Sequence, residues 1–395
     1  MIELDAVAVR ALRLEPSPTL SIAEKARRLQ AQGHKIVKLD IGEPDFDTPS
    51  FIVEAAIEAL KSGATHYTSS RGIPELRHAI SEFYGRVLNV DVDPERELIV
   101  TPGSKFALYS AIQIIVDEGD EVIILTPAWP TYKSCVKLAG GRIIEVPCMS
   151  SGRLDEELLK ESITSRTKLL IVNSPNNPTG EVLPPSDLKI LVDLAQDHDF
   201  FIISDEVYRF IVYDEVKPYT MLSFPEIRDK LVVVDGFSKT WAMTGWRLGF
   251  AVAPSELIRY MNMMQQNATT CPTSFVQYAA IKALSEPLDS IKYMIDEYNR
   301  RRLYIVNELN SVDGIKCNLP KGAFYVFPDI SGLSIDSEQF AEKLLTKAHV
   351  CVLPGISFGL GGEHHIRISY ATSMMMLKEG VSRIKSFIEN ELKKT

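Results

Sequence analysis

Short apolar runs recur through the first 280 residues and are separated by segments in which apolar residues recur with helical spacing. Most of these runs are nearly continuous in Val, Ile and Leu, which is typical of strands covered on both faces. Helical spacing between the runs, as in residues 105–116 and 185–196, predicts an α/β fold with a large, mostly parallel sheet sandwiched by helices. The expected strands are residues 97–101, 121–126, 142–146, 168–173, 200–204, 231–235 and 247–252.

The pattern changes after residue 285. A long helical segment covers residues 291–310, and its run Arg300, Arg301 and Arg302 is expected on a solvated face. Shorter elements follow and predict a smaller α+β domain over residues 286–395. We expect the large domain over residues 50–285, with the segment 1–49 packed against the small domain. The shorter elements are strands at 323–327, 350–353 and 366–369, a helix near 337–347 and a final charged helix.

Composition narrows the class of protein. The 395 residues are 45% hydrophobic and 24% charged, which are ordinary globular values. A net charge of −9 makes nucleic acid a poor partner, and no apolar run approaches the roughly 20 residues of a membrane-spanning helix. The N-terminus does not resemble a secretory signal. Five scattered cysteines without a C-x-x-C spacing predict free thiols in a reducing cytoplasm, with no disulfide framework and no metal site.

The most informative motif follows the apolar run 231–235 and reads GFSKTWAMTGWRLG over residues 236–249. It places Lys239 just beyond a strand and Arg247 eight residues later. A lysine whose pKa is lowered can form a Schiff base with a carbonyl, and a guanidinium suits a phosphate. Taken alone, such a motif would in most cases be a surface lysine in a loop.

This segment resembles the lysine motif of class I aminotransferases, the pyridoxal-phosphate enzymes of fold type I. The resemblance is narrowest to the aspartate aminotransferases of bacteria and archaea, and it extends from residues 39–46 (LDIGEPDF) to residues 367–371 (RISYA). It implies pyridoxal 5'-phosphate held as an aldimine on Lys239. Lys239 then moves the α-proton, and an amino group passes through pyridoxamine phosphate to a second 2-oxo acid in a ping-pong cycle.

Two further motifs carry residues for the cofactor ring. In NSPNNPTG, residues 173–180, the resemblance makes Asn177 a donor to the 3'-oxygen and suggests a cis bond before Pro178. In SDEVY, residues 204–208, it pairs Asp205 with the ring nitrogen and lets Tyr208 share the 3'-oxygen. Without the resemblance, the first motif is an ordinary loop and Asp205 an ordinary helix cap.

The resemblance assigns the remaining cofactor contacts to three segments. The strand-to-helix loop 101–105 cradles the phosphate, because amide groups at a helix start bind anions. Related enzymes often carry a phosphate-binding serine where this chain has Gly236. The phosphate is therefore expected to be bound by Ser238, Arg247 and the loop at Gly103. Trp129 is expected to stack on the ring rather than to be a plain core residue. The expected phosphate ligands are Gly103, Ser104, Lys105, Ser238 and Arg247.

Two segments are expected to reach a neighbouring subunit. Tyr67 matches a residue that contacts the phosphate of the partner, and residues 267–274 resemble a loop that crosses to it. The resemblance therefore implies a homodimer in which the active sites are shared across the interface.

Substrate binding is expected to begin with Arg367, because an arginine in an apolar strand needs a carboxylate partner. The alternative is an internal salt bridge. The resemblance adds Gly42, Trp129 and Asn177 as substrate contacts. Residues 262–280 contain no charged residue, so one known arginine for dicarboxylates is missing. The branch that this chain resembles uses a lysine and small hydroxyl residues instead, which match Lys105, Ser17 and Thr19; a surface lysine and loop hydroxyls are the plain alternatives.

We therefore expect a cytoplasmic aminotransferase, with L-aspartate as donor and 2-oxoglutarate as acceptor. A broad-specificity alanine or aromatic aminotransferase, or another fold type I enzyme such as a C–S β-lyase or a decarboxylase, would share the same central residues. A ligand-sensing regulator would need a DNA-binding module, for which the stretch before Gly42 is too short. A nicotinamide dehydrogenase would need a G-x-G-x-x-G after a strand, which the sequence lacks. His364 and His365 are expected to be exposed turn residues.

Overall fold

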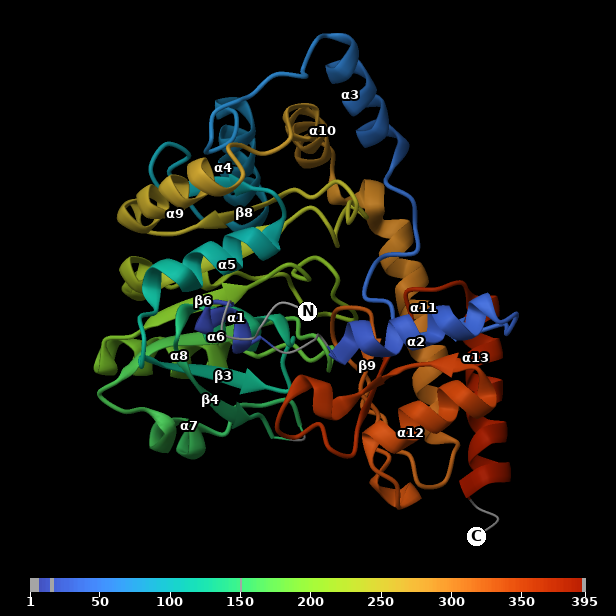
Figure 1. Cartoon of the computed structure of the whole chain (residues 1–395). Coiled ribbons are helices and arrows are strands. Elements are labelled where there is room, and N and C mark those ends of the chain that lie inside the picture. The colour runs from blue at the N-terminus through green and yellow to red at the C-terminus, as the bar shows by residue number, and fades with distance from the viewer. Residues whose placement is uncertain (1–6, 15–17, 150, 393–395) are drawn as a thin grey trace.

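The computed structural model describes residues 7–14, 18–149 and 151–392. A large sheet with helices on both faces forms one part, and the C-terminal helices and short strands form a smaller part beside it (Figure 1). The N-terminal helix α2 (Pro18–Ala31) lies on the smaller part (Figure 1). The strand β1 (Val37–Lys38) also belongs there, because it pairs in parallel with β10 (Val350–Cys351). The expected division at residues 50 and 286 stays a prediction.

The large sheet has seven strands in the order β2-β8-β7-β6-β5-β3-β4. All of its strands run parallel except β8, which is antiparallel to both of its neighbours. The predicted mostly parallel sheet is therefore confirmed. The strands in chain order are β2 (Leu98–Thr101), β3 (Glu121–Thr126), β4 (Arg142–Pro147), β5 (Thr167–Asn173), β6 (Phe201–Asp205), β7 (Leu231–Gly236) and β8 (Gly249–Val252).

Burial on both faces explains why these strands are continuously apolar. Successive residues of a strand point to opposite faces, so Ile123 and Ile124 join two different apolar clusters. Helices α5 (Ser104–Ile115), α6 (Thr131–Ala139) and α9 (Ser255–Ala268) supply residues to the cluster on one face. The other face is covered by α4 (Pro74–Leu88), α8 (Pro185–His198) and α10 (Ser274–Ser285).

Several shorter helices complete the large part. Helix α3 (Ser50–Lys61) packs on α10, and α1 (Val9–Leu12) lies near α6. Helix α7 (Glu156–Ser162) follows β4. Among the described residues, none of the helices combines the length and apolar character that crossing a bilayer requires.

The smaller part is built on a three-stranded antiparallel sheet in the order β11-β12-β9. Its strands are β9 (Tyr325–Val326), β11 (Leu353–Pro354) and β12 (Ile366–Ser369), flanked by α11 (Lys292–Asn310), α12 (Ser337–Lys343) and α13 (Met374–Phe387). The single strand expected over residues 350–353 is wrong. The chain changes pairing partner there, so that β10 pairs with β1 while β11 pairs with β12.

The expected solvated face of three arginines in α11 is also wrong. Successive helical residues are about 100° apart, so three in a row cannot share one face. Arg300 is exposed, but Arg301 is buried against Asp45 and Arg302 is buried in an ion pair with Asp214. The five cysteines are free, as expected.

Candidate active site

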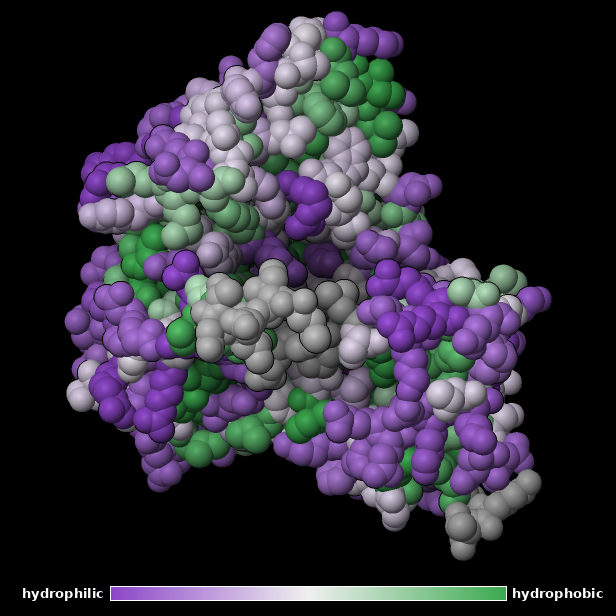
Figure 2. All heavy atoms as spheres, in the orientation of Figure 1, coloured by the Kyte–Doolittle hydropathy of each residue, from purple (hydrophilic) through white to green (hydrophobic). Residues whose placement is uncertain are grey.

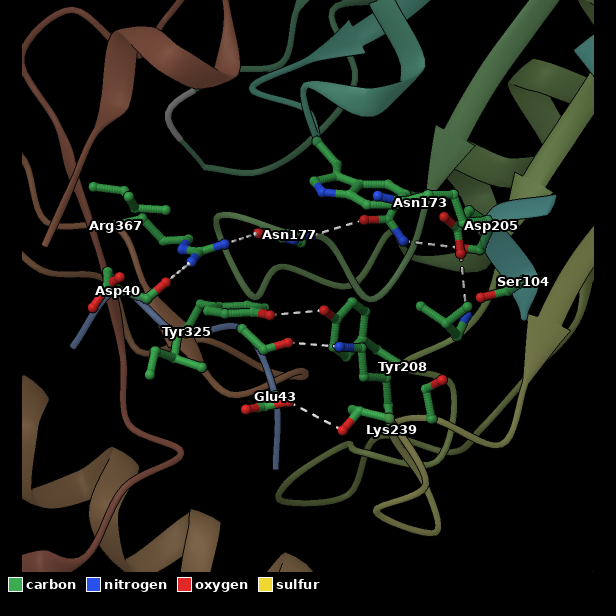
Figure 3. Close-up of a pocket in the computed structure, with 18 of the residues that line it drawn as sticks. Asp40, Glu43, Ser104, Asn173, Asn177, Asp205, Tyr208, Lys239, Tyr325 and Arg367 are labelled. Carbon is green, nitrogen blue, oxygen red and sulfur yellow. Dashed lines mark hydrogen bonds between the residues drawn. The ribbon is translucent and has the colours of Figure 1, made fainter. Parts of the chain in front are cut away.

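A cavity of about 560 Å³ opens at the carboxyl ends of the parallel strands, where the large sheet meets the smaller part. The loops after β2, β5, β6 and β7 contribute one wall, and β9, β12 and the segment after β1 contribute the other (Figure 3). Open α/β sheets bind ligands at this edge. Eleven of the residues predicted for the site line the cavity: Gly42, Ser104, Lys105, Trp129, Asn177, Asp205, Tyr208, Ser238, Lys239, Arg247 and Arg367.

Lys239 lies just beyond β7, and its amine points into the cavity. Its Nζ donates a hydrogen bond to the carbonyl oxygen of Gly42 at 2.6 Å. Burial, followed by the charge of Arg367, lowers the pKa of Lys239 to about 8. A substantial neutral fraction near neutral pH is what an amine needs to act as a nucleophile or a base.

Asp205 ends β6 and is held by two donors. The Tyr132 hydroxyl donates to Oδ2 at 2.7 Å, and the backbone N–H of Val207 donates to Oδ1 at 3.3 Å. Burial raises the pKa of Asp205 to about 6, against the opposing effect of the Tyr132 hydrogen bond. The carboxyl group is therefore largely ionised at pH 7 and is a buried acceptor for a cationic donor.

A chain of amides connects Asp205 to Asn177. The Asn173 side chain donates from Nδ2 to the Asp205 carbonyl oxygen at 2.9 Å, and its Oδ1 accepts from the Asn177 N–H at 2.8 Å. Asn173 and Tyr132 were not predicted as site residues. Asn173 is the first residue of the motif NSPNNPTG, and its place there could have identified it as a site residue. Nothing in the sequence marks Tyr132.

Arg367 on β12 is 4% exposed and makes no ion pair within the described residues. Its guanidinium donates to the Asn177 Oδ1 at 3.0 Å and to the Asp40 carbonyl oxygen at 2.5 Å, while Nε lacks a partner (Figure 3). The alternative of an internal salt bridge is therefore not realised among these residues. A buried, unpaired guanidinium beside a cavity suits a ligand carboxylate.

A pair of tyrosines joins the two parts of the molecule beside Lys239. The Tyr208 and Tyr325 hydroxyls are 2.8 Å apart (Figure 3), and burial raises the pKa of both. Tyr325 lies on β9 and was not predicted, because an apolar strand with a tyrosine carries no recognisable motif. Gly42 is required here, since a Cβ on it would lie 2.7 Å from the Tyr325 hydroxyl oxygen.

The opposite end of the cavity fits a phosphate. Gly103 precedes α5 with a φ of +83°, and a Cβ on it would lie 2.7 Å from the guanidinium of Arg247. That guanidinium donates to the Thr244 carbonyl oxygen and has no carboxylate partner within the described residues. The Ser104 and Ser238 side chains line the same end. At Gly236, a Cβ would lie 3.0 Å from the Cα of Gly249, so a serine there would require a small shift of the neighbouring strand.

Lys105 and Trp129 lie together at the cavity wall. The Lys105 Nζ is 4.8 Å from the Trp129 ring centroid, and burial lowers the pKa of this lysine. The lysine is partly solvent-exposed, yet it lines the cavity and forms no ion pair within the described residues. Its charge is thus available to a ligand.

Two further expectations are wrong, the cis bond before Pro178 and the exposure of His365. The bond before Pro178 is trans, and the cis bonds precede Pro127 and Pro175. His365 is half-buried because its ring stacks on Phe327 at 4.9 Å, whereas His364 is exposed. No group of histidine, cysteine and acidic residues suited to a metal occurs in the described part of the chain.

The four other predicted residues are not among those that line the cavity. Gly103 lies beside it, directly before α5. Tyr67 is 85% exposed and lies outside it. Ser17 falls outside the described residues, and for Thr19 only the backbone, in α2, is described.

Replacing Lys239 with methionine is expected to stabilise the cofactor-free protein at pH 7. Burial lowers the pKa of this lysine to about 8 from an ordinary value near 10.5, so the protonated amine costs stability at lower pH. That cost is full below pH 8, declines between pH 8 and 10.5 and vanishes above. Urea unfolding of both proteins at pH 7 and pH 10.5 measures it; an equal difference at the two pH values would contradict the assignment.

The profile of the family described as "Aminotransferase class I and II" matches residues 34–384. An aspartate aminotransferase of Pyrococcus horikoshii is 42% identical over 98% of both chains, and an aromatic-amino-acid aminotransferase of Thermococcus litoralis is 40% identical over 98% of this chain and 99% of its own. The structure of the Thermus thermophilus aspartate aminotransferase with maleate superposes with a TM-score of 0.91, at 40% identity, and covers 96% of this chain and 99% of its own.

Proposed function

The chain belongs to the class I and II aminotransferase family, and from this premise we propose that it transfers the amino group of L-aspartate to a 2-oxo acid with the help of pyridoxal phosphate. The observation that carries the proposal is the joint placement of Lys239, Asp205 and Arg367 around one cavity. These three groups are a reactive amine, a buried carboxylate and an unpaired guanidinium. A cofactor aldehyde, its ring nitrogen and a substrate carboxylate need these three partners.

The residues of the cavity fit this cofactor. The start of α5, with Gly103, Ser104 and Lys105, together with Ser238 and Arg247, would hold the phosphate. Asp205 would pair with the ring nitrogen, Asn177 and Tyr208 would hold the 3'-oxygen, and Trp129 would cover the ring. Tyr67 would add a contact from the partner subunit. When bound, pyridoxal phosphate supplies a reactive aldehyde and a ring that withdraws electrons from the α-carbon of the substrate.

Each part of the chain then has a defined task. Arg367 binds the α-carboxylate and so orients the substrate, with Gly42 and Asn177 beside it. The Lys239 amine, which is partly neutral near pH 8, would take the α-proton from the substrate and pass it to the cofactor in the first half of the cycle. In the second half it would move a proton in the opposite direction, to the α-carbon of the new amino acid. Asp205 stays ionised at neutral pH and stabilises positive charge at the buried end of the cavity.

The proposed preference for a substrate with two carboxylates rests on Lys105 and on the names of the relatives. The free charge of Lys105 lies at the cavity wall, where a second carboxylate of the substrate can reach it. Ser17 and Thr19 are the proposed additional contacts. The Pyrococcus horikoshii relative is named for aspartate, and the Thermus thermophilus structure holds maleate, itself a dicarboxylate. The Thermococcus litoralis relative is named for aromatic amino acids, which makes an aromatic donor the second candidate.

Steady-state kinetics with several donors separates these candidates. With 2-oxoglutarate as acceptor, kcat/KM for L-aspartate is expected to exceed the values for L-alanine and L-tyrosine. Lys105→Met is expected to lower the value for aspartate selectively and leave that for alanine within about twofold. A higher value for tyrosine than for aspartate would replace the dicarboxylate assignment with the aromatic one.

Arg367→Gln is expected to lower kcat/KM by about 10²- to 10³-fold, because a charged, buried contact to a carboxylate is worth roughly 2–5 kcal/mol. The effect should be of similar size for aspartate and alanine, since both carry the α-carboxylate. Measuring both donors checks this point. A loss confined to aspartate would mean that Arg367 binds the side-chain carboxylate instead.

A second copy of the chain is the proposed partner. Helix α3 exposes Val53, Ile57 and Leu60 along one face, at 36%, 45% and 42% of their surface. Figure 2 shows this apolar area at the top of the molecule, over α3. Exposed apolar patches of this kind mark interfaces. Tyr67, at 85% exposure, follows α3 in the chain and would reach the partner's cavity from such an interface.

Ile57→Glu is expected to shift the protein from dimer to monomer, because it places a charge in the centre of this apolar face. Specific activity should fall with dissociation and recover as protein concentration rises. Glu54→Lys, an exposed polar position on the same helix, is the matched control. Light scattering coupled to size-exclusion chromatography measures the mass; a wild-type monomer, or an Ile57→Glu dimer of unchanged stability, would contradict the assignment.

A further inference from the structure

A buried cluster of charges lies directly behind the proposed active site. The Arg209 guanidinium is 1% exposed, and its NH2 group donates to the Asp235 Oδ2 at 2.5 Å and to the Tyr84 hydroxyl at 2.6 Å. The same nitrogen is 3.1 Å from the Glu206 Oε2. One cation thus faces two buried carboxylates.

The cluster joins two loops that carry site residues. Glu206 and Arg209 belong to the turn after β6, next to Asp205 and Tyr208 respectively. Asp235 belongs to β7, and its Oδ1 accepts a hydrogen bond from the Gly236 N–H at 2.7 Å. Lys239 follows three residues later. The Arg209–Asp235 ion pair is therefore a side-chain link between the turn of Asp205 and the loop of Lys239.

Stability alone is a weak reason for such a pair. Buried ion pairs pay a desolvation cost that a well-packed apolar pair avoids. Here the cost is high, because the Nε and NH1 groups of Arg209 have no partner and burial raises the pKa of Asp235 to about 7. The remaining contribution of the pair is geometric, since a directional charged contact fixes two loops relative to each other.

The backbone supports the same link. The Glu206 N–H donates to the Val234 carbonyl oxygen at 2.9 Å, and Glu206 Oε1 accepts from the Ser204 hydroxyl and from the Met221 N–H, both at 2.9 Å. Glu206 is thereby anchored on the β6 side independently of Arg209. Within the described residues, the ion pair is the direct side-chain contact between this turn and Asp235, and the Tyr84 hydroxyl, 3.4 Å from the Asp235 Oδ2, bridges the same two groups.

We propose that Arg209 and Asp235 are positioning residues, which act through the two loops to hold the Lys239 amine at its working distance from the Asp205 carboxylate. The proposal rests on the proposed function, because the distance between the Lys239 amine and the Asp205 carboxylate matters only if both groups hold one cofactor. Neither residue lines the cavity. Any effect of their substitution on cofactor binding must therefore be transmitted through Asp205, Tyr208 and Lys239.

Cofactor affinity is the first readout. Arg209→Met is expected to weaken binding of pyridoxal phosphate to the cofactor-free protein by more than tenfold, measured by equilibrium dialysis. Arg209→Lys, which can still reach Asp235, should restore at least half of the loss on a logarithmic scale. Phe210→Leu is the matched control. It destabilises the same turn and removes only a ring contact of the Arg209 guanidinium, 5.5 Å from the ring centroid, while both charges of the ion pair stay in place; its affinity should stay within twofold of the wild type.

Hydrogen exchange gives a readout that does not depend on the cofactor. In Arg209→Met, amides of residues 236–239 should exchange at least tenfold faster than in the wild type, although the substitution lies on the other loop. In Phe210→Leu, those amides should keep the wild-type rate. If Arg209→Met does not fold, Asp235→Asn replaces it, since the amide oxygen still accepts from Gly236 while the charged partner is lost.

The outcomes separate the two ideas. Unchanged exchange at residues 236–239 in Arg209→Met and Asp235→Asn would overturn the positioning role, whether or not pyridoxal phosphate binds. Equal losses of affinity in Arg209→Met and Phe210→Leu at equal losses of stability would also overturn it, because the pair would then be only structural. A third outcome is faster exchange at residues 236–239 in Arg209→Met, together with a wild-type protein that does not bind pyridoxal phosphate. It would support the link between the loops and contradict the proposed function.

Discussion

Lys239→Ala is expected to lower kcat/KM for transamination by at least about 10⁴-fold, the largest effect of any single substitution in the chain. The amine is both the covalent anchor and the proton carrier in the proposed cycle, and general acid–base catalysis alone contributes roughly 10²- to 10⁴-fold. Its lowered pKa, about 8, and its hydrogen bond to Gly42 suit both tasks. Coupled measurement of oxaloacetate formation tests the loss.

Lys239→Arg is the companion variant for this prediction. It keeps a positive charge in the cavity but cannot form a Schiff base or accept a proton near neutral pH. It should be as inactive as Lys239→Ala, while it still binds pyridoxal phosphate through the protein groups that hold the phosphate. Residual activity above about 1% of wild type in either variant would show that another group moves the proton.

Asp205→Asn is expected to have the second-largest effect, a fall in kcat of roughly 10²- to 10³-fold, which is typical when one preorganised charge contact is lost. The substitution is nearly isosteric, and the Tyr132 hydroxyl can still donate to the amide oxygen. The substitution therefore removes the charge that the ring nitrogen would meet, together with the long hydrogen bond from the Val207 N–H at 3.3 Å.

The pH profile isolates this charge. Burial raises the pKa of Asp205 to about 6, so the carboxylate is present above pH 6 and is lost as the pH falls through it. Wild-type kcat should therefore decline on the acid side of pH 6, and the profile of Asp205→Asn should lack that decline. A full acid limb in the variant would assign it to a different group.

The sheet and much of the cavity could be predicted because each rests on a local pattern. Strands buried on both faces need continuous apolar residues, and β3 was predicted with the bounds that it has. The loops that follow such strands meet at one edge of a parallel sheet. Asp205 at the end of β6 and Lys239 just beyond β7 were therefore expected to lie near each other.

Contacts between residues that are distant in the sequence could not be predicted. Tyr325 contacts Tyr208 across 117 positions, and nothing near it in the sequence marks that contact. Arg301 and Arg302 were misplaced because a run of charges resembles a solvated face, whereas Asp45 and Asp214 neutralise them from distant segments. Pairing partners that are distant in sequence decide whether a charge is buried.

The most direct test of the central claim is the visible absorbance of the protein loaded with pyridoxal phosphate during titration with L-aspartate, with no acceptor present. The account predicts that the band of the Lys239-bound cofactor disappears with one equivalent converted per subunit, and that 2-oxoglutarate restores it. A loaded band that L-aspartate leaves unchanged, while L-tyrosine or L-alanine converts it, would contradict the dicarboxylate assignment. Failure of the protein to develop the band with pyridoxal phosphate would contradict the assignment of the cavity itself.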